Sequence, residues 1–141
     1  MVETITGGCQ CGAVRYQCSA GPIVAGHCQC TNCQKFTGAG HASNMMLPKD
    51  AFTVTGEMTR FDYTADSGNI MTRLFCSKCG SPVYGYGSGN PAAVMVRAGG
   101  LDDPSIFEAN FALFTDSAQA WDPIDPEIKS FPGMPPPKPA A

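Results

Sequence analysis

Residues 70–86 read IMTRLFCSKCGSPVYGY. Runs rich in apolar and β-branched residues occupy 70–75 and 82–86, with Cys76, Cys79 and Gly80 between them. This pattern predicts two strands joined by a tight turn that brings two thiols together. A C-x-x-C turn followed by glycine is typical of zinc ribbons, so the stretch is interpreted as a strand, a metal-binding turn and a strand.

The other cysteines follow the same clustering. Of the eight in the chain, seven fall into three tight groups, and only Cys18 stands alone. In a reducing compartment such spacing indicates metal before disulfide. The groups are Cys9/Cys11, Cys28/Cys30/Cys33 and Cys76/Cys79. Cys18 is expected to be an unliganded, part-buried thiol.

A second pair of thiols, Cys9 and Cys11, could complete a four-sulfur metal site with Cys76 and Cys79. Side chains at positions i and i+2 of a strand lie on one face, so both thiolates of a C-x-C point the same way. Four sulfurs make the closed tetrahedral shell of structural zinc, and such a site would clip a long loop of chain. A set of buried or redox-active thiols is the alternative.

The triple Cys28-x-Cys30-x-x-Cys33 differs, because one segment supplies three thiolates and no fourth cysteine is adjacent. Three protein ligands plus an open position is the arrangement of catalytic zinc. A closed site completed by His27, His41 or Cys18 is the alternative. His27 would face away from Cys28 on a strand. His41 is a candidate proton shuttle, although a packed or surface histidine is the simpler role for it.

The three-thiolate ligand set also restricts the chemistry. Three thiolates leave a divalent ion with a net charge of −1, which weakens its pull on a bound water and makes hydrolysis less natural. A thiolate-rich site suits a sulfur ligand, whose proton is lost on coordination while the sulfur stays nucleophilic. The residues alone therefore predict a thiol-binding zinc site.

The rest of the chain predicts a mainly β fold with little helix. Strand patterns cover 13–18, 41–47, 93–98 and 107–114, and 52–55 with 59–63 are expected to form a hairpin around Gly56. In 107–114 apolar residues alternate with polar ones, so Phe107 and Phe111 are expected on the same, apolar face of the strand. The 16 glycines and 12 prolines disfavour helices longer than a turn or two. Trp121 is expected to be a packing anchor.

Length and composition predict one domain. A chain of 141 residues with 43% hydrophobic residues can bury a single core, placed at 1–131. Residues 132–141 are proline-rich and are expected to be an extended or flexible tail.

Charge and hydropathy exclude two classes of partner. The net charge is −3 and the 9 Lys and Arg form no basic run, so no nucleic-acid partner is expected. No signal peptide is recognised, and no window approaches the roughly 18 apolar residues of a membrane helix, so no membrane partner is expected. We expect a cytoplasmic protein. The oligomeric state is not predicted.

Five motifs resemble the glutathione-dependent formaldehyde-activating enzyme family (GFA, also CENP-V/GFA) and occur in its order along nearly the whole chain. They are Gly8-Cys9-Gln10-Cys11-Gly12-Ala13-Val14-Arg15-Tyr16, His27-Cys28-Gln29-Cys30-Thr31-Asn32-Cys33, Phe75-Cys76-Ser77-Lys78-Cys79-Gly80-Ser81-Pro82, Gly100-Leu101-Asp102-Asp103-Pro104 and the Trp121, Ile124, Phe131 ending.

The resemblance implies a β-tent fold of the Mss4-like type, with antiparallel sheets and zinc at their junction. It implies two Zn²⁺ sites: Cys9, Cys11, Cys76 and Cys79 structural, and Cys28, Cys30 and Cys33 reactive. The implied activity is that of a carbon–sulfur lyase, which interconverts S-(hydroxymethyl)glutathione with glutathione and formaldehyde. The sequence departs from the family after Cys33, where Gln34 and a single Lys35 replace a frequent basic pair.

Glutathione as the thiol partner would require cations for its two carboxylates. The candidates are Lys35, Arg60, Arg73 and Arg97, with a solvated strand residue as the alternative for each. Two other functions fit the same cysteines: a non-catalytic carrier of glutathione or another thiol, and an interaction module in which both zincs are structural.

Overall fold

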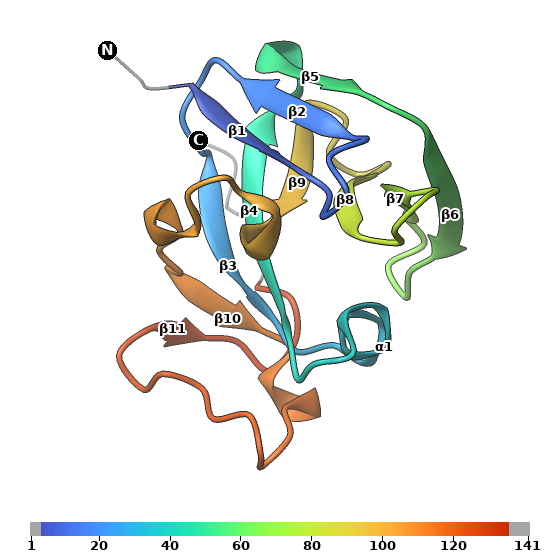
Figure 1. Cartoon of the computed structure of the whole chain (residues 1–141). Coiled ribbons are helices and arrows are strands. Elements are labelled where there is room, and N and C mark those ends of the chain that lie inside the picture. Colours follow the sequence, from blue (N-terminus) through green and yellow to red (C-terminus); the bar gives the residue numbers. More distant parts are fainter. Residues whose placement is uncertain (1–3, 136–141) are drawn as a thin grey trace. The chain divides into compact units, whose positions relative to one another are not determined.

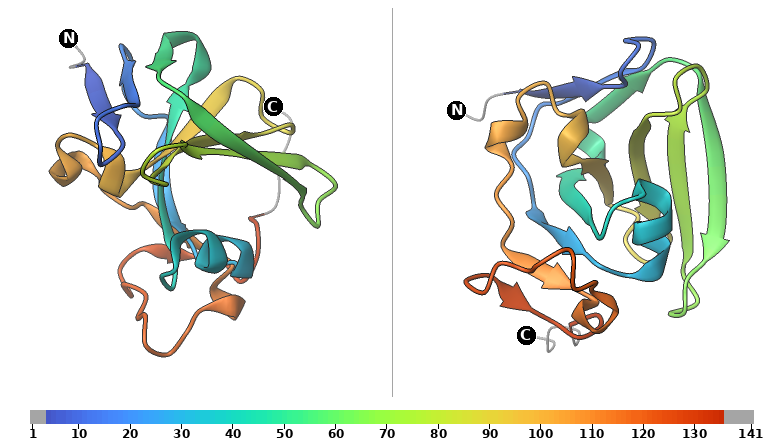
Figure 2. Two further views of the ribbon diagram at one scale, coloured as in Figure 1. Left: turned by 45° about the vertical axis from the view of Figure 1, so that its right-hand side comes forward. Right: turned by 60° about the horizontal axis from the view of Figure 1, so that its bottom comes forward.

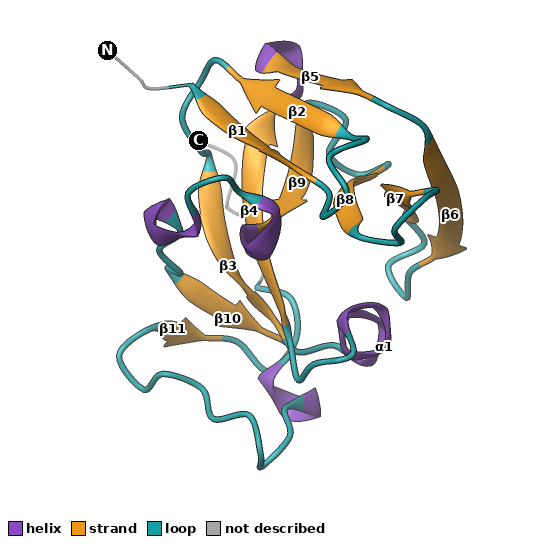
Figure 3. Cartoon of the chain, viewed as in Figure 1, coloured by secondary structure: helices purple, strands orange, loops and turns teal. Residues whose placement is uncertain are grey.

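A computed structural model describes residues 4–135 of the chain and has a mainly β fold (Figures 1 and 3). This part contains eleven strands, one α-helix and four short 3-10 turns, which confirms the predicted class. The strands are β1 (Ile5–Gly8), β2 (Arg15–Cys18), β3 (Val24–Cys28), β4 (Ala42–Pro48), β5 (Phe52–Thr55), β6 (Met58–Thr64), β7 (Ile70–Cys76), β8 (Pro82–Gly87), β9 (Ala93–Arg97), β10 (Phe111–Leu113) and β11 (Lys129–Ser130), and the helix is α1 (Thr31–Thr37).

The described residues divide into two compact units. The larger unit comprises residues 4–24 and 44–107, and the smaller unit comprises residues 25–43 and 108–135. Within residues 4–135, no helix has both the length and the apolar content that a membrane crossing requires. Residues 136–141, which make up most of the predicted tail, lie outside the described part. The carbonyls of Pro132 and Gly133 accept backbone hydrogen bonds from Asp116 and Phe114.

One sheet of the larger unit is three-stranded and antiparallel, in the order β1-β2-β5. The alternating pattern of β2 explains its position, because Tyr16 and Cys18 are buried while Arg15 and Gln17 are exposed. Arg15 pairs with Asp102, and Thr6 donates a hydrogen bond of 2.7 Å to the same carboxylate. This ion pair attaches the sheet to the loop that follows β9.

The second sheet of the larger unit runs in the order β4-β9-β8-β7-β6, and all of its pairs are antiparallel. The long β6 and β7 strands run side by side in Figure 2. One face of this sheet is apolar, with Leu47 and Val96 fully buried. Tyr84 on that face contacts Phe52 of β5 with ring centroids 5.0 Å apart, so the core of this unit lies between its two sheets.

The predicted hairpin of 52–55 with 59–63 is wrong. β5 pairs with β2 and β6 pairs with β7, so the two segments belong to different sheets. Gly56 allows this crossing, because it has φ +111° and a Cβ there would lie 2.3 Å from the Ala13 carbonyl oxygen. The sequence correctly indicated a turn at this glycine. The direction in which the chain leaves the turn is set by close packing against the backbone of Ala13.

The smaller unit is built on parallel pairing, which the sequence did not indicate. β10 lies parallel to both β3 and β11. Gly26 of β3 makes this possible, because a Cβ there would lie 2.5 Å from the Phe111 ring. The strand predicted over 107–114 covers only Phe111–Leu113. Its buried residue is Ala112 rather than Phe111, so the prediction of which residues face the core is wrong.

Trp121 also differs from expectation. Its side chain is 68% exposed, so it is not a packing anchor. The adjacent Asp122 is the residue that turns inward, where it contacts His41.

The glycine at the crossing between the sheets gives a stability prediction. Gly56→Ala is expected to lower the free energy of unfolding by more than about 2 kcal/mol, since it adds a clash to the cost of positive φ. Gly68→Ala is the control: Gly68 has φ +89° and nothing within 4 Å of an added Cβ, so about 1 kcal/mol is expected. Urea unfolding measures both, and equal losses would contradict the clash.

Candidate metal centres

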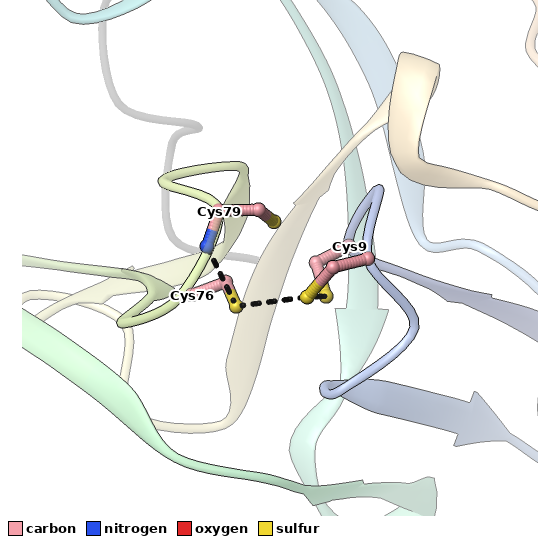
Figure 4. A group of neighbouring side chains, drawn as sticks. Cys9, Cys76 and Cys79 are labelled. Carbon is pink, nitrogen blue, oxygen red and sulfur yellow. Dashed lines mark hydrogen bonds between the residues drawn. The ribbon is translucent and has the colours of Figure 1, made fainter.

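Four cysteines of the larger unit converge at one point (Figure 4). Cys9 and Cys11 lie in the turn after β1, Cys76 ends β7, and Cys79 lies in the turn before β8. The Sγ atoms of Cys9 and Cys11 are 3.6 Å apart, those of Cys11 and Cys76 are 3.7 Å apart, and all four lie within 4.8 Å of one another. Tetrahedral zinc with Zn–S bonds of about 2.3 Å needs sulfurs about 3.8 Å apart, so the group could hold this ion.

Backbone N–H groups aim at the sulfurs of this group. Val14 donates to Cys9 Sγ at 3.2 Å, and Lys78 and Cys79 donate to Cys76 Sγ at 3.4 and 3.5 Å. Gly80 has φ +78°, a conformation that lets the turn close after Cys79. Hydrogen bonds to sulfur favour its anionic form, so both turns are suited to thiolates.

Ser81 links the two cysteine turns. Its hydroxyl oxygen accepts a hydrogen bond from the Gln10 N–H at 3.1 Å and lies 3.2 Å from Cys79 Sγ. Since the oxygen accepts from Gln10, the hydroxyl proton can be donated to the sulfur. This contact lowers the pKa of Cys79 to about 5, helped by backbone N–H groups. The sequence interpretation missed Ser81, although its position just after C-x-x-C-Gly was a signal.

Three cysteines of the smaller unit form a second group. Cys28 ends β3, Cys30 is the N-cap of α1, and Cys33 lies on the helix. Their Sγ atoms lie within 4.8 Å of one another. The N–H of Cys33 donates to Cys30 Sγ at 3.3 Å, so a thiolate here also satisfies the first turn of the helix.

The surroundings of this second group are largely apolar. Cys28 and Cys33 are buried with Ala42, and Leu113 and Phe114 pack against them. Hydrogen bonding among the three sulfurs lowers the pKa of Cys30 and raises that of Cys28, because the thiols cannot all ionise together without a cation. A divalent ion would remove this conflict, so the donor set fits a metal.

No fourth Cys, His, Asp or Glu within residues 4–135 joins the second group. The two histidines have other partners: His27 Nδ1 is 3.0 Å from Ser43 Oγ, and His41 Nδ1 is 2.6 Å from Asp122 Oδ2. Cys18 is fully buried in β2, and its thiol donates to the Ala20 carbonyl at 3.4 Å. The described part of the chain thus offers three ligands here and four in the larger unit.

Gln34 has a structural role beside the second group. Its Nε2 donates to the carbonyls of Gln29 and Ser117 at 2.7 and 2.8 Å, which holds the start of α1 to the chain after β10. The residue directly after Cys33 is therefore an amide tied to the backbone and carries no charge. Lys35 next to it is exposed.

The geometry defines a class of protein: a mainly β protein with one group of four cysteines and one of three that could each hold a metal ion. The sequence model of the family described as glutathione-dependent formaldehyde-activating enzyme (GFA) matches residues 4–117. The chain belongs to this family. No curated protein sequence matches it significantly.

A solved structure supports the fold. The chain is similar to a Rhodobacter sphaeroides protein whose crystal structure is known, with 21% identity and a TM-score of 0.57. The match covers 74% of this chain and 96% of the other.

The hydroxyl beside Cys79 gives a prediction for the four-cysteine group. Ser81→Ala should weaken zinc binding roughly tenfold, because outer-shell hydrogen bonds orient the ligands. Ser77→Ala is the matched control, since Ser77 lies in the same turn but bonds Thr59 Oγ1 at 2.9 Å. Chelator competition measures the affinity, and the same loss in both variants would argue against a specific role for Ser81.

Proposed function

We propose that the protein is a zinc-dependent carbon–sulfur lyase that interconverts S-(hydroxymethyl)glutathione with glutathione and formaldehyde. The observation that carries the proposal is the three-cysteine group, which leaves part of a tetrahedral shell to an outside ligand. Membership in the GFA family supports glutathione as that ligand. Four cysteines in the larger unit would hold the second, structural ion.

Cys28, Cys30 and Cys33 would hold the reactive ion. Bound zinc would lower the pKa of a coordinating thiol so that its sulfur is a nucleophilic thiolate near neutral pH. The chain itself keeps the three ligands in place, through the Cys33 N–H bond to Cys30 and the packing of Ala42 on Cys28. Leu113 and Phe114 give the site a partly apolar wall, which strengthens electrostatic interactions there.

The reaction balances without another reactant. In the direction of synthesis, the S–H bond of glutathione breaks and a bond forms between its sulfur and the formaldehyde carbon. The carbonyl π bond opens, and the proton released by the thiol ends on the former carbonyl oxygen. The reverse steps release formaldehyde, so the same residues serve both directions.

The ligand set favours this chemistry over hydrolysis. Three thiolates outweigh the charge of a divalent ion by one, so activation of water would be weak compared with a site of three neutral histidines. A soft sulfur ligand suits this environment better. An interaction module with two closed zincs is less well supported, because it requires a fourth ligand that the described residues do not bring to this group.

Replacement of one ligand tests the proposal. Cys30→Ser should abolish the acceleration of adduct formation between glutathione and formaldehyde and lower the bound zinc from two ions to one. Rates are measured by exchange NMR with ¹³C-formaldehyde. Cys18→Ala is the control, because this buried thiol belongs to neither group, and it should keep both the rate and the metal.

Two outcomes would count against catalysis. Wild-type protein with two zincs that leaves the rate unchanged would contradict it. Tight glutathione binding in calorimetry together with that result would favour the thiol carrier instead.

A further inference from the structure

Strand β6 is the last strand of the second sheet of the larger unit, and it is labelled at the right of Figure 1. One of its edges pairs with β7 along all seven residues in a regular register. Its other edge pairs with no strand among residues 4–135. Five of the seven residues are exposed, so a long and regular strand presents an open edge to solvent.

The open edge carries the backbone groups of alternate residues. In an antiparallel pair each residue directs its N–H and C=O either toward the partner strand or away from it, and the two kinds alternate. At one end of the β6–β7 pair, the Ala65 N–H donates to the Asn69 carbonyl at 2.8 Å. At the other end, the Ser77 N–H donates to the Glu57 carbonyl at 3.3 Å. Odd-numbered residues therefore face β7, and the even-numbered residues of β6 direct their backbone groups outward.

This edge lacks most of the features that keep edge strands from pairing with other chains. Proline, lysine, bulges and short length are the usual ones, and β6, with the sequence MTRFDYT, has none of them. Its middle residue, Phe61, is 55% exposed and stacks on Tyr63 with ring centroids 6.2 Å apart. An exposed aromatic pair on an open edge favours pairing with another strand. The two charges of β6 then decide which strand fits.

The sequence of β6 is complementary to itself. Phe61 is the middle residue of the strand, with Arg60 before it and Asp62 after it. If two copies of β6 pair antiparallel with Phe61 opposite Phe61, then Arg60 of each copy lies opposite Asp62 of the other. All seven residues of each strand have a partner in this register. Opposite charges on directly opposite residues stabilise an antiparallel pair, and like charges destabilise it.

The same register satisfies the outward backbone groups. Arg60 and Asp62 both direct their N–H and C=O groups outward, so they form a hydrogen-bonded pair across the edge. Phe61 then forms the non-hydrogen-bonded pair, in which opposite side chains approach most closely. Sliding one strand by two residues keeps the backbone pairing but places Arg60 opposite Arg60 or Asp62 opposite Asp62. The charges therefore select the register centred on Phe61.

Both charged side chains are accessible to a second copy. The Arg60 and Asp62 side chains are 56% and 43% exposed, and Arg60 Nε lies 3.0 Å from Asp62 Oδ1 in the same strand. Asp62 also accepts a hydrogen bond of 2.7 Å from Thr72, which fixes the carboxylate on its face of the sheet. A guanidinium has five N–H donors, so Arg60 can keep its partner in the strand and also meet the carboxylate of the second copy.

We propose that β6 binds β6 of a second copy of this chain, by antiparallel pairing about a two-fold axis at Phe61. The product is a closed, isologous dimer in which the second sheet of each larger unit continues into that of the other copy. The proposal is independent of the proposed function, because it uses none of the cysteines of either group. It also supplies an oligomeric state, which the sequence patterns leave open.

Charge reversal tests the proposal in the full chain, under reducing conditions that exclude disulfide-linked dimers. Sedimentation equilibrium of wild-type protein up to about 0.5 mM should approach twice the mass of the 14.8 kDa chain, because a small interface gives a weak, concentration-dependent dimer. Asp62→Arg and Arg60→Asp should each raise the dimer Kd by at least about tenfold, since like charges then lie opposite each other at two positions.

An equimolar mixture of the two variants tests the register. One chain then has arginine at positions 60 and 62 and the other has aspartate at both, so every charged pair is complementary again and a one-to-one dimer should form with a Kd near that of wild type. Asp50→Arg is the matched control for Asp62→Arg, because it makes the same change in net charge at an exposed residue outside β6, and it should leave the Kd unchanged.

Thermal melts verify that each variant is folded. Phe61→Glu carries the test if Asp62→Arg unfolds, because it places two like charges opposite each other at the two-fold axis and should raise the Kd in the same way. Wild-type protein that stays monomeric at about 0.5 mM would overturn the proposal. Folded single variants that dimerise as tightly as wild type, or a mixture that associates no better than its components, would overturn it as well.

Discussion

The convergence of four thiols in the larger unit is the constraint on which the rest of the structure depends. Cys11 and Cys76 are 65 positions apart in the chain, yet their sulfurs lie 3.7 Å apart. Four thiols within 4.8 Å of one another would be a poor arrangement for anions alone, and a divalent cation makes it favourable. That ion would join the end of β1 to the turn between β7 and β8, and so one sheet of this unit to the other.

The two cysteine groups differ in ways that fit different tasks. The first draws on two turns far apart in sequence, and N–H donors and Ser81 surround its sulfurs, which suits a permanent closed site. The second comes from one short segment, has three sulfurs, and meets a partly apolar wall that includes Leu113. A local ligand set can form without clipping distant strands, which fits the proposal that this group leaves a position for an outside ligand.

The sequence predicted those features that depend on short spacings. The triple Cys28/Cys30/Cys33, each of the two cysteine pairs of the other group and the strand–turn–strand around Cys76 are encoded within a few residues. The features it did not predict depend on distant partners. β5 and β6 belong to different sheets because of the backbone near Gly56, and β10 lies parallel to β3 because Gly26 makes room for an aromatic ring. Periodicity reports a face, but not which strand will lie beside it.

The coordination of the metal is the most direct test of this account. X-ray absorption at the zinc edge of protein purified without chelators should give two zinc ions per chain with Zn–S distances of about 2.3 Å. Seven protein sulfurs shared between the two ions, with a lighter atom or an exogenous sulfur completing the second shell, is the expected result. Metal-free protein, or cysteines joined as disulfides, would contradict it.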